Sequence, residues 1–139
     1  MAIVDQLNIF LENKPGSLKR FCEVLRDHGI NMRALLLPDH RDYGVVRLVV
    51  DDAEEAIEIL KDAKILALKS PAIAVELENR PGALGEIAER LAGVGVDIDY
   101  AYGSSAGERA TLILGVSDLE RAHRALEGHG TAWPGSSSR

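Results

Sequence analysis

The chain has 139 residues, of which 46% are apolar and 27% are charged, and its formal net charge at pH 7 is −6. This mixture is typical of a folded globular protein and excludes a disordered one. The acidic balance argues against a nucleic-acid partner, because phosphate binding depends on clustered Lys and Arg side chains.

Cysteine and apolar patterning exclude further classes. The single cysteine, Cys22, cannot form an internal disulfide, and no Cys/His cluster suggests a metal site. The apolar runs are broken by charged residues well before the roughly 20 residues that a membrane span requires. We therefore expect a cytoplasmic protein without metal or cofactor, and with no membrane partner.

An internal repeat organises the sequence. A shift of 66 residues superimposes residues 11–18 on residues 77–84, and the same offset aligns Gly29 with Gly95 and Leu60 with Leu126. This register predicts one structural unit over residues 1–69 and a second over residues 70–133. Residues 134–139 form a Gly/Ser-rich tail that we expect to be disordered.

The first copy begins with alternating apolar residues at 7–11, a pattern that predicts a half-buried strand. A helix follows, because residues 18–25 carry apolar side chains at i, i+3, i+4 and i+7, and Gly29 fits the left-handed position after its end. Two strands are expected at 30–37 and 43–50, joined by a polar turn. A second helix is predicted after Asp51, whose side chain precedes Glu54 by three residues as in a capping box, and a closing strand at 64–69.

The second copy repeats this order after a linker at Ser70 and Pro71. We expect strands at 73–77, 96–102 and 109–116, a helix over 84–91 that ends near Gly95, and a second helix after Ser117, which precedes Glu120 by three residues. The counterpart of the closing strand, residues 128–133, is a poor strand sequence.

The order strand, helix, strand, strand, helix, strand predicts an α+β fold. Each copy is expected to form a ferredoxin-like βαββαβ unit, with an antiparallel four-stranded sheet and both helices on one face. A unit of about 60 residues is marginally stable alone. Pairing of the two copies, or of two chains in a homodimer, would cover the other sheet face.

Two motifs carry a resemblance to a known family. The segments Glu-Asn-Lys-Pro-Gly-Ser-Leu (12–18) and Glu-Asn-Arg-Pro-Gly-Ala-Leu (78–84), followed by Gly-Ile-Asn-Met (29–32) and Gly-Val-Asp-Ile (95–98), resemble characteristic stretches of ACT domains. The resemblance covers about residues 7–126. It implies a non-catalytic regulatory module that binds an amino acid at interfaces between paired domains, and that acts beside a metabolic enzyme.

A free amino acid needs hydrogen-bond donors for its carboxylate and acceptors for its ammonium group. Backbone N–H groups at the start of each first helix are unpaired within the helix and favour an anion, while proline and glycine shape the turn and let a ligand approach. An oxygen from Asn31 or Asp97, or a carbonyl nearby, is expected to accept from the ammonium group. The candidate ligand-binding residues are Asn13, Lys14, Pro15, Gly16, Ser17, Leu18, Asn31, Asn79, Arg80, Pro81, Gly82, Ala83, Leu84 and Asp97.

Simpler interpretations stand beside this one. A Pro-Gly turn into a helix is a common structural device, and the preceding Asn can serve only as a cap. Asp97 and Asp99 share a strand face but have no third partner for a cation or for acid–base catalysis. The alternative function is a regulatory or scaffolding subunit of a separate metabolic enzyme, acting by protein contact without its own ligand.

Overall fold

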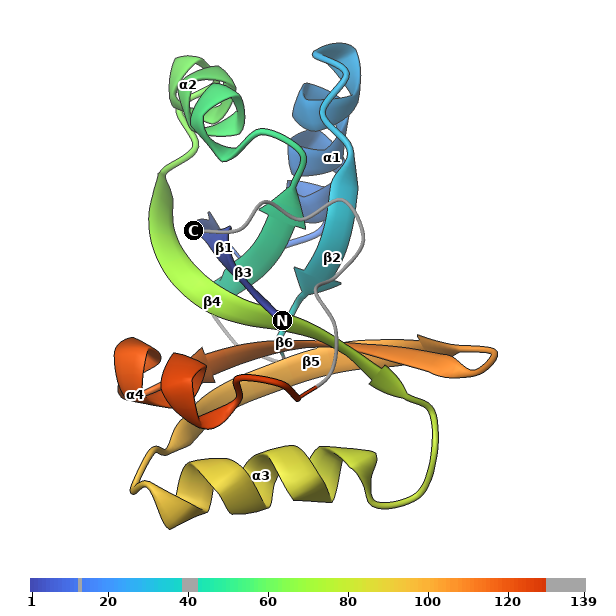
Figure 1. Cartoon of the computed structure of the whole chain (residues 1–139). Coiled ribbons are helices and arrows are strands. Elements are labelled where there is room, and N and C mark those ends of the chain that lie inside the picture. The colour runs from blue at the N-terminus through green and yellow to red at the C-terminus, as the bar shows by residue number, and fades with distance from the viewer. Residues whose placement is uncertain (13, 39–42, 130–139) are drawn as a thin grey trace. The chain divides into compact units, whose positions relative to one another are not determined.

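The computed structural model describes residues 1–12, 14–38 and 43–129 (Figure 1). The chain divides into two compact units. The first unit comprises residues Asp5–Ser70, and the second unit comprises Met1–Val4 together with Pro71–Arg139. The boundary falls beside the expected one at residue 69, but the first four residues group with the second unit.

The first unit contains β1 (Ala2–Glu12, from Asp5 onward), α1 (Ser17–Asp27), β2 (Met32–Leu36), β3 (Tyr43–Val50), α2 (Ala53–Asp62) and the beginning of β4 (Ala67–Glu78). Its strand order is β2-β3-β1-β4. β3 pairs antiparallel with both β1 and β2. Alternate residues of β1, including Leu7 and Ile9, pack with Phe21 and Leu25 of α1 and Leu60 of α2, so both helices share one core with the strands.

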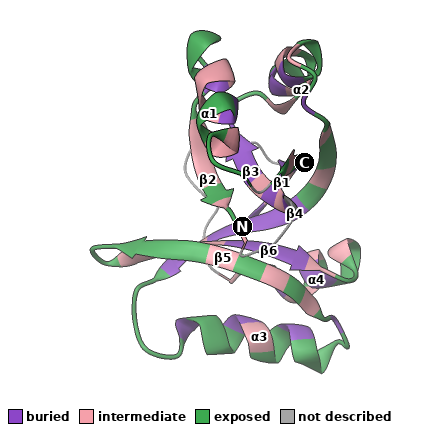
Figure 2. Cartoon of the chain, turned by 180° about the vertical axis from the view of Figure 1, so that it is seen from behind, coloured by how far each residue is buried: buried purple, intermediate pink, exposed green. Residues whose placement is uncertain are grey.

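The second unit is built in the same way from the end of β4, α3 (Ala83–Gly93), β5 (Ile98–Ala106), β6 (Arg109–Val116) and α4 (Leu119–Ala125). β6 pairs antiparallel with β4 and β5. Its core joins Ile73 and Val75 of β4 to Ile87 and Leu91 of α3 and Leu126 after α4. Figure 2 shows that buried residues concentrate on β6, whereas β5 is mainly exposed.

Residues at the N-terminus contribute a strand segment to the second unit. Within this unit the order is β1-β4-β6-β5, with Ala2–Val4 as the part of β1 that belongs to it. Ala2 and Val4 are buried, and Met1 packs against the second core. Residues 130–133 and the tail at 134–139 lie outside the described residues.

The α+β class is confirmed, but the expected eight strands in two separate four-stranded sheets are a miscount. The described residues form six strands, because β1 and β4 each contribute to both units. The expected linker at Ser70 and Pro71 lies inside β4. Proline fixes φ at about −65°, which strand positions without a ladder N–H tolerate, and it favours an extended backbone at the residue before it, so a strand can pass through this pair.

The helix caps differ by one residue from the prediction. Asp52, not Asp51, caps α2 through a 3.1 Å bond from the Glu55 N–H, and Asp118, not Ser117, caps α4 through a 3.1 Å bond from the Arg121 N–H. Both aspartates have extended backbones, as a capping residue requires. The predicted left-handed glycines are confirmed, with φ of 71° at Gly29 and 72° at Gly95.

Candidate functional site

The loop from β1 to α1 places a sharp turn directly before the helix. Gly16, at φ 89°, is the residue before α1, and no side chain forms a capping hydrogen bond there. Gly82 repeats this geometry before α3, at φ 90°. Such positive φ values favour glycine because it has no Cβ. The first turn of each helix thus begins without the side-chain acceptor that caps α2 and α4.

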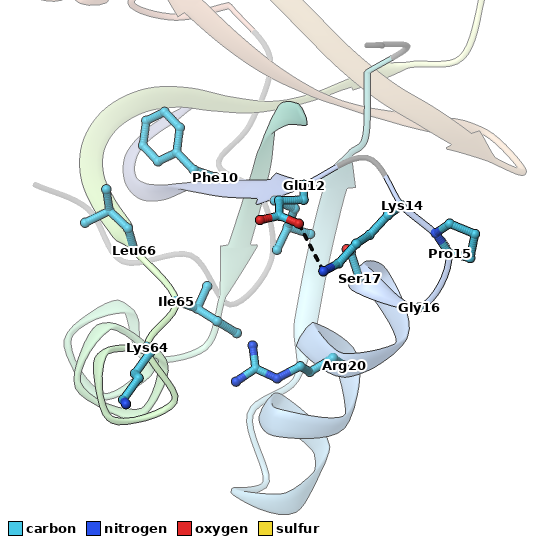
Figure 3. A pocket seen from close by; sticks show the side chains of 11 residues that line it. Phe10, Glu12, Lys14, Pro15, Gly16, Ser17, Arg20, Lys64, Ile65 and Leu66 are labelled. Carbon is cyan, nitrogen blue, oxygen red and sulfur yellow. Dashed lines mark ion pairs between the residues drawn. The ribbon is translucent and has the colours of Figure 1, made fainter. Parts of the chain in front are cut away.

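A groove of about 600 Å³ lies along this loop in the first unit (Figure 3). We call it the first groove. It is formed by the end of β1, the loop, the start of α1 and the segment between α2 and β4. The lining residues are Phe10, Leu11, Glu12, Lys14, Pro15, Gly16, Ser17, Arg20, Lys64, Ile65 and Leu66.

Both signs of charge occur in the first groove. The Lys14 ammonium lies 3.0 Å from the Glu12 carboxylate, and both side chains are about two-thirds exposed. Arg20 donates to the Ala63 carbonyl oxygen over 2.7 Å, which ties its guanidinium to the end of α2. Figure 3 shows Glu12, Lys14 and Arg20 directed toward the space between α1 and the segment that carries Ile65. The groove therefore offers donors and an acceptor within one open space.

A smaller hollow of about 80 Å³ adjoins the same loop. It shares Glu12, Lys14 and Ser17 with the first groove and adds Leu18 and Pro38 among its lining residues. Leu18 also packs against the first core. Leu18 thus contacts both the hollow beside the loop and the hydrophobic core.

The second unit has a corresponding groove of about 350 Å³, which we call the second groove. Its cations are already paired with carboxylates of the chain. Arg80 donates to both oxygens of Glu86 over 2.9 and 2.8 Å and to Glu78 over 3.0 Å, while Arg109 donates to Glu76 over 2.7 Å. The hydrogen bonds to Glu86, and then to Glu78, raise the pKa of Arg80 further above its ordinary value.

The two grooves differ at equivalent positions of the repeat. Ser17 in the first corresponds to Ala83 in the second, and Arg20 corresponds to Glu86. The second groove therefore lacks the hydroxyl group and contains an internal carboxylate where the first contains a guanidinium group. The grooves are chemically distinct although their loops have the same backbone conformation.

The structure brings together only part of the candidate set. Lys14, Pro15, Gly16 and Ser17 line the first groove, and Arg80 and Ala83 line the second. Asn13 lies outside the described residues. The other candidates are not lining residues of these grooves: Asn31, Asn79, Pro81, Gly82, Leu84 and Asp97.

Asn31 and Asp97 follow the C-terminal ends of α1 and α3, whereas the loops precede their N-terminal ends. A helix of this length spans about 16 Å. Neither residue thus reaches the loop of its own unit. Asn79 instead holds the β5–β6 turn, donating from its side chain to the Gly107 carbonyl oxygen over 2.9 Å.

Phe10, Leu11, Glu12, Arg20 and the segment Lys64–Leu66 line the first groove but were not among the predicted site residues. Lys64–Leu66 is distant in sequence from the motif, so local pattern did not connect it. Phe10, Leu11, Glu12 and Arg20 lie within or beside the motif at 12–18, but the predicted site around this loop was confined to residues 13–18. One signal was available in the repeat alignment: Arg20 and Glu86 have opposite charges at the same position, beside otherwise similar loops.

Among the described residues, no group of three or more His, Cys, Asp or Glu side chains could hold a metal ion. Asp97 and Asp99 are both exposed, and Cys22 packs partly buried against the first core. Tyr100 and Tyr102 stack with ring centroids 6.5 Å apart. No helix in the described part of the chain has the length and apolar character that a membrane crossing requires.

Comparisons with known proteins identify the family. Solved structures similar to the chain include protein BT0572 from Bacteroides thetaiotaomicron, with 32% identity, a TM-score of 0.87, and coverage of 91% of this chain and 88% of that one. The regulatory subunit of aspartate kinase from Thermus thermophilus has 19% identity and a TM-score of 0.65, with coverage of 92% and 93%. No curated protein matches. The family model described as an ACT domain pair matches residues 1–128, and the chain therefore belongs to the ACT domain pair family.

Proposed function

We propose that this protein is a non-catalytic regulatory protein that binds an amino acid in the first groove. The observation that carries the proposal is the combination of Lys14, Arg20, the Ser17 hydroxyl and the Glu12 carboxylate around one open space of about 600 Å³. A free amino acid presents both a carboxylate and an ammonium group, and the volume is in the range of small-molecule sites.

The roles of the groups follow from their chemistry. The ligand carboxylate is assigned to the Ser17 side and the start of α1, where Lys14 adds a cation and no side chain caps the helix. The ammonium group is assigned to the Glu12 carboxylate. Glu12 and Lys14 are both exposed, so an ion pair between them is weak and readily exchanged for contacts with a ligand.

The second groove is proposed to be a packing element rather than a binding site. The guanidinium of Arg80 is already satisfied by Glu78 and Glu86, so a ligand carboxylate would have to displace a bidentate internal partner. One ligand per chain is the expected stoichiometry.

We also propose that the protein regulates a separate enzyme and that it assembles as a homodimer. The aspartate kinase regulatory subunits of Thermus thermophilus and Thermus flavus share this fold over 92% of the chain, at 19% identity. They support a regulatory class without identifying the partner. If a ligand prefers one assembled state, its binding shifts the population by that difference in affinity.

The first experiment is thermal unfolding of the purified protein against each of the twenty amino acids at millimolar concentration. A ligand that binds only the folded state stabilises it by about 2.7 kcal/mol at 100 times its Kd. We expect a selective, dose-dependent rise in Tm with one or a few amino acids.

This rise should be smaller in the Ser17→Ala variant, because alanine is the residue at the equivalent position of the second unit. Glu86→Gln, in the second groove, is the matched control and should retain the full rise. An unchanged Tm with every amino acid would exclude this function and favour regulation by protein contact alone.

A further inference from the structure

The first groove is positively charged although the chain as a whole is acidic. Its lining contains the cations of Lys14, Arg20 and Lys64 and the carboxylate of Glu12, which leaves a balance of +2. The whole chain carries −6. A hollow of one charge sign attracts ligands of the opposite sign and disfavours those of the same sign.

The second groove provides an internal comparison. Its lining contains Glu76, Glu78 and Glu86 against Arg80 and Arg109, a balance of −1 with His129 neutral. The repeat therefore retains the fold of the loop while its charge differs by three units between the copies. The positive balance is a property of the first groove and not a requirement of the backbone turn.

The pair of Arg80 and Glu86 shows how a carboxylate fits beside this loop. Both oxygens of Glu86 accept from the same guanidinium nitrogen of Arg80, at 2.9 and 2.8 Å. In the first unit the residue equivalent to Glu86 is Arg20. The loop and the helix thus both carry a cation in the first unit, Lys14 and Arg20, and Arg20 stands where the second unit has its internal carboxylate.

Arg20 is held in place while keeping donors for a ligand. Its bond to the Ala63 carbonyl oxygen, at 2.7 Å, uses one of the five N–H donors of a guanidinium group. The planar fork of the remaining donors matches a carboxylate. Figure 3 shows the guanidinium beside Ile65, at the end of the groove away from Pro15. A ligand anchored at the loop would therefore meet Arg20 with its far end.

Lys64 adds charge at the rim. Figure 3 shows the Lys64 side chain on the α2 side, extending away from the Arg20 guanidinium. A ligand at Arg20 would therefore feel the charge of Lys64 at a distance and would not contact it. Its φ is 61°, and every other described residue with a positive φ is glycine. A lysine thus occupies a backbone position where glycine is the more stable choice, and it gives the rim a cation.

We propose that the first groove selects an acidic amino acid, whose side-chain carboxylate binds Arg20 while its backbone groups bind at the β1–α1 loop. This inference rests on the proposed function and specifies its ligand class. The positive lining, the open donors of Arg20 and the missing internal carboxylate each favour a ligand with a net negative charge.

The test is isothermal titration with four ligands: L-aspartate, L-glutamate and their neutral isosteres L-asparagine and L-glutamine. We expect an acidic ligand to bind about tenfold or more tightly than its isostere. Arg20→Gln should remove most of that difference, so that an acidic ligand and its isostere bind within about twofold of each other. Lys64→Gly should weaken acidic ligands by a smaller factor that diminishes as salt is raised. Lys19→Gln, at an exposed cation of α1 outside the groove, is the control and should change nothing.

The outcomes separate the two proposals. Equal binding of acidic ligands and their isosteres, or no binding of the four while another amino acid raises the Tm in the thermal screen, overturns the charge inference and leaves amino-acid binding intact. Loss of both ligand types in Arg20→Gln, in a protein that remains folded by circular dichroism, assigns Arg20 a general rather than a selective role and also overturns it. No binding of any amino acid overturns the proposed function itself.

Discussion

Lys64 combines an unfavourable backbone conformation with a position at the groove. It follows the end of α2, where its N–H donates to the Lys61 carbonyl oxygen and the Ile65 N–H donates to that of Leu60. This is the hydrogen-bond arrangement in which a left-handed residue ends a helix, usually a glycine. The stability of the fold therefore favours glycine at this position, whereas the proposed selection of an acidic ligand favours lysine.

Lys64→Gly is predicted to raise the free energy of unfolding by about 0.5 to 1 kcal/mol, because glycine adopts a positive φ without a Cβ penalty. Urea denaturation monitored by circular dichroism measures the change. The reverse control is Gly29→Ala, at φ 71°, which is expected to lower stability by about 1 kcal/mol. A Lys64→Gly variant that is less stable than the unchanged protein would contradict the inference that the backbone of Lys64 is strained.

At the residue scale, the sequence predicted the loop better than the groove. Lys14, Pro15, Gly16 and Ser17 are adjacent in sequence, so one motif predicted them together. Arg20 and Lys64 reach the same space from α1 and from the end of α2, a proximity that depends on how the helices pack. Asn31 was assigned from its place in the motif, although the sequence already placed it after Gly29, at the end of α1 away from the loop.

At the scale of elements, the caps of α2 and α4 show how a one-residue ambiguity is resolved. Asp51 and Asp52 are both suitable capping residues in sequence, and the glutamate three residues after Asp51 favoured the earlier one. The structure uses Asp52, whose carboxylate accepts from the Glu55 N–H. Glutamates at 54 and 55 then both lie in the first turn, where the helix dipole favours negative charge.

We predict that Asp52→Ala lowers the free energy of unfolding by about 1 kcal/mol, through loss of the capping bond. Asp51→Ala, one residue earlier and also exposed, is the matched control and should change stability by less than about 0.5 kcal/mol. Chemical denaturation of the two variants side by side makes the comparison. Equal losses would indicate a general charge effect in place of a cap.

Helices and strand faces were predicted well because their signals are local. Apolar spacing located α1 and α3, and alternation located the strands at 7–11 and 73–77, which lie in β1 and β4. Whether one strand continues through a given residue pair is not decided by such local patterns. Ser70 and Pro71 were interpreted as a break because proline usually punctuates strands, yet the residue pair favours the extended backbone that β4 needs.

At the scale of the whole molecule, the first four residues belong with a unit that begins about 70 residues later. No local pattern could predict this, since Ala2–Val4 continues directly into the part of β1 that pairs with β3. The weak strand sequence at 128–133 was the indirect sign. A unit whose own closing segment is a poor strand sequence needs another strand beside β4.

Val4→Asp is predicted to destabilise the second unit, because Val4 is only 5% exposed and a buried unpaired carboxylate is unfavourable. Native-state hydrogen exchange should show a larger loss of protection in α3 and β6 than in α1. Ile3→Asp, at a more exposed neighbouring position, is the control and should have a smaller effect. Greater loss in α1 than in α3 would contradict the grouping of the N-terminus with the second unit.

This grouping has a consequence for how the protein is made. Residues Met1–Val4 are translated before the part of β4 that belongs to their unit, which begins at Pro71 and follows on the order of ten seconds later. During that interval Met1–Val4 have no strand of their own unit to pair with. The second unit can therefore be completed only after β4 has been made, whereas most of the first unit is already available to fold.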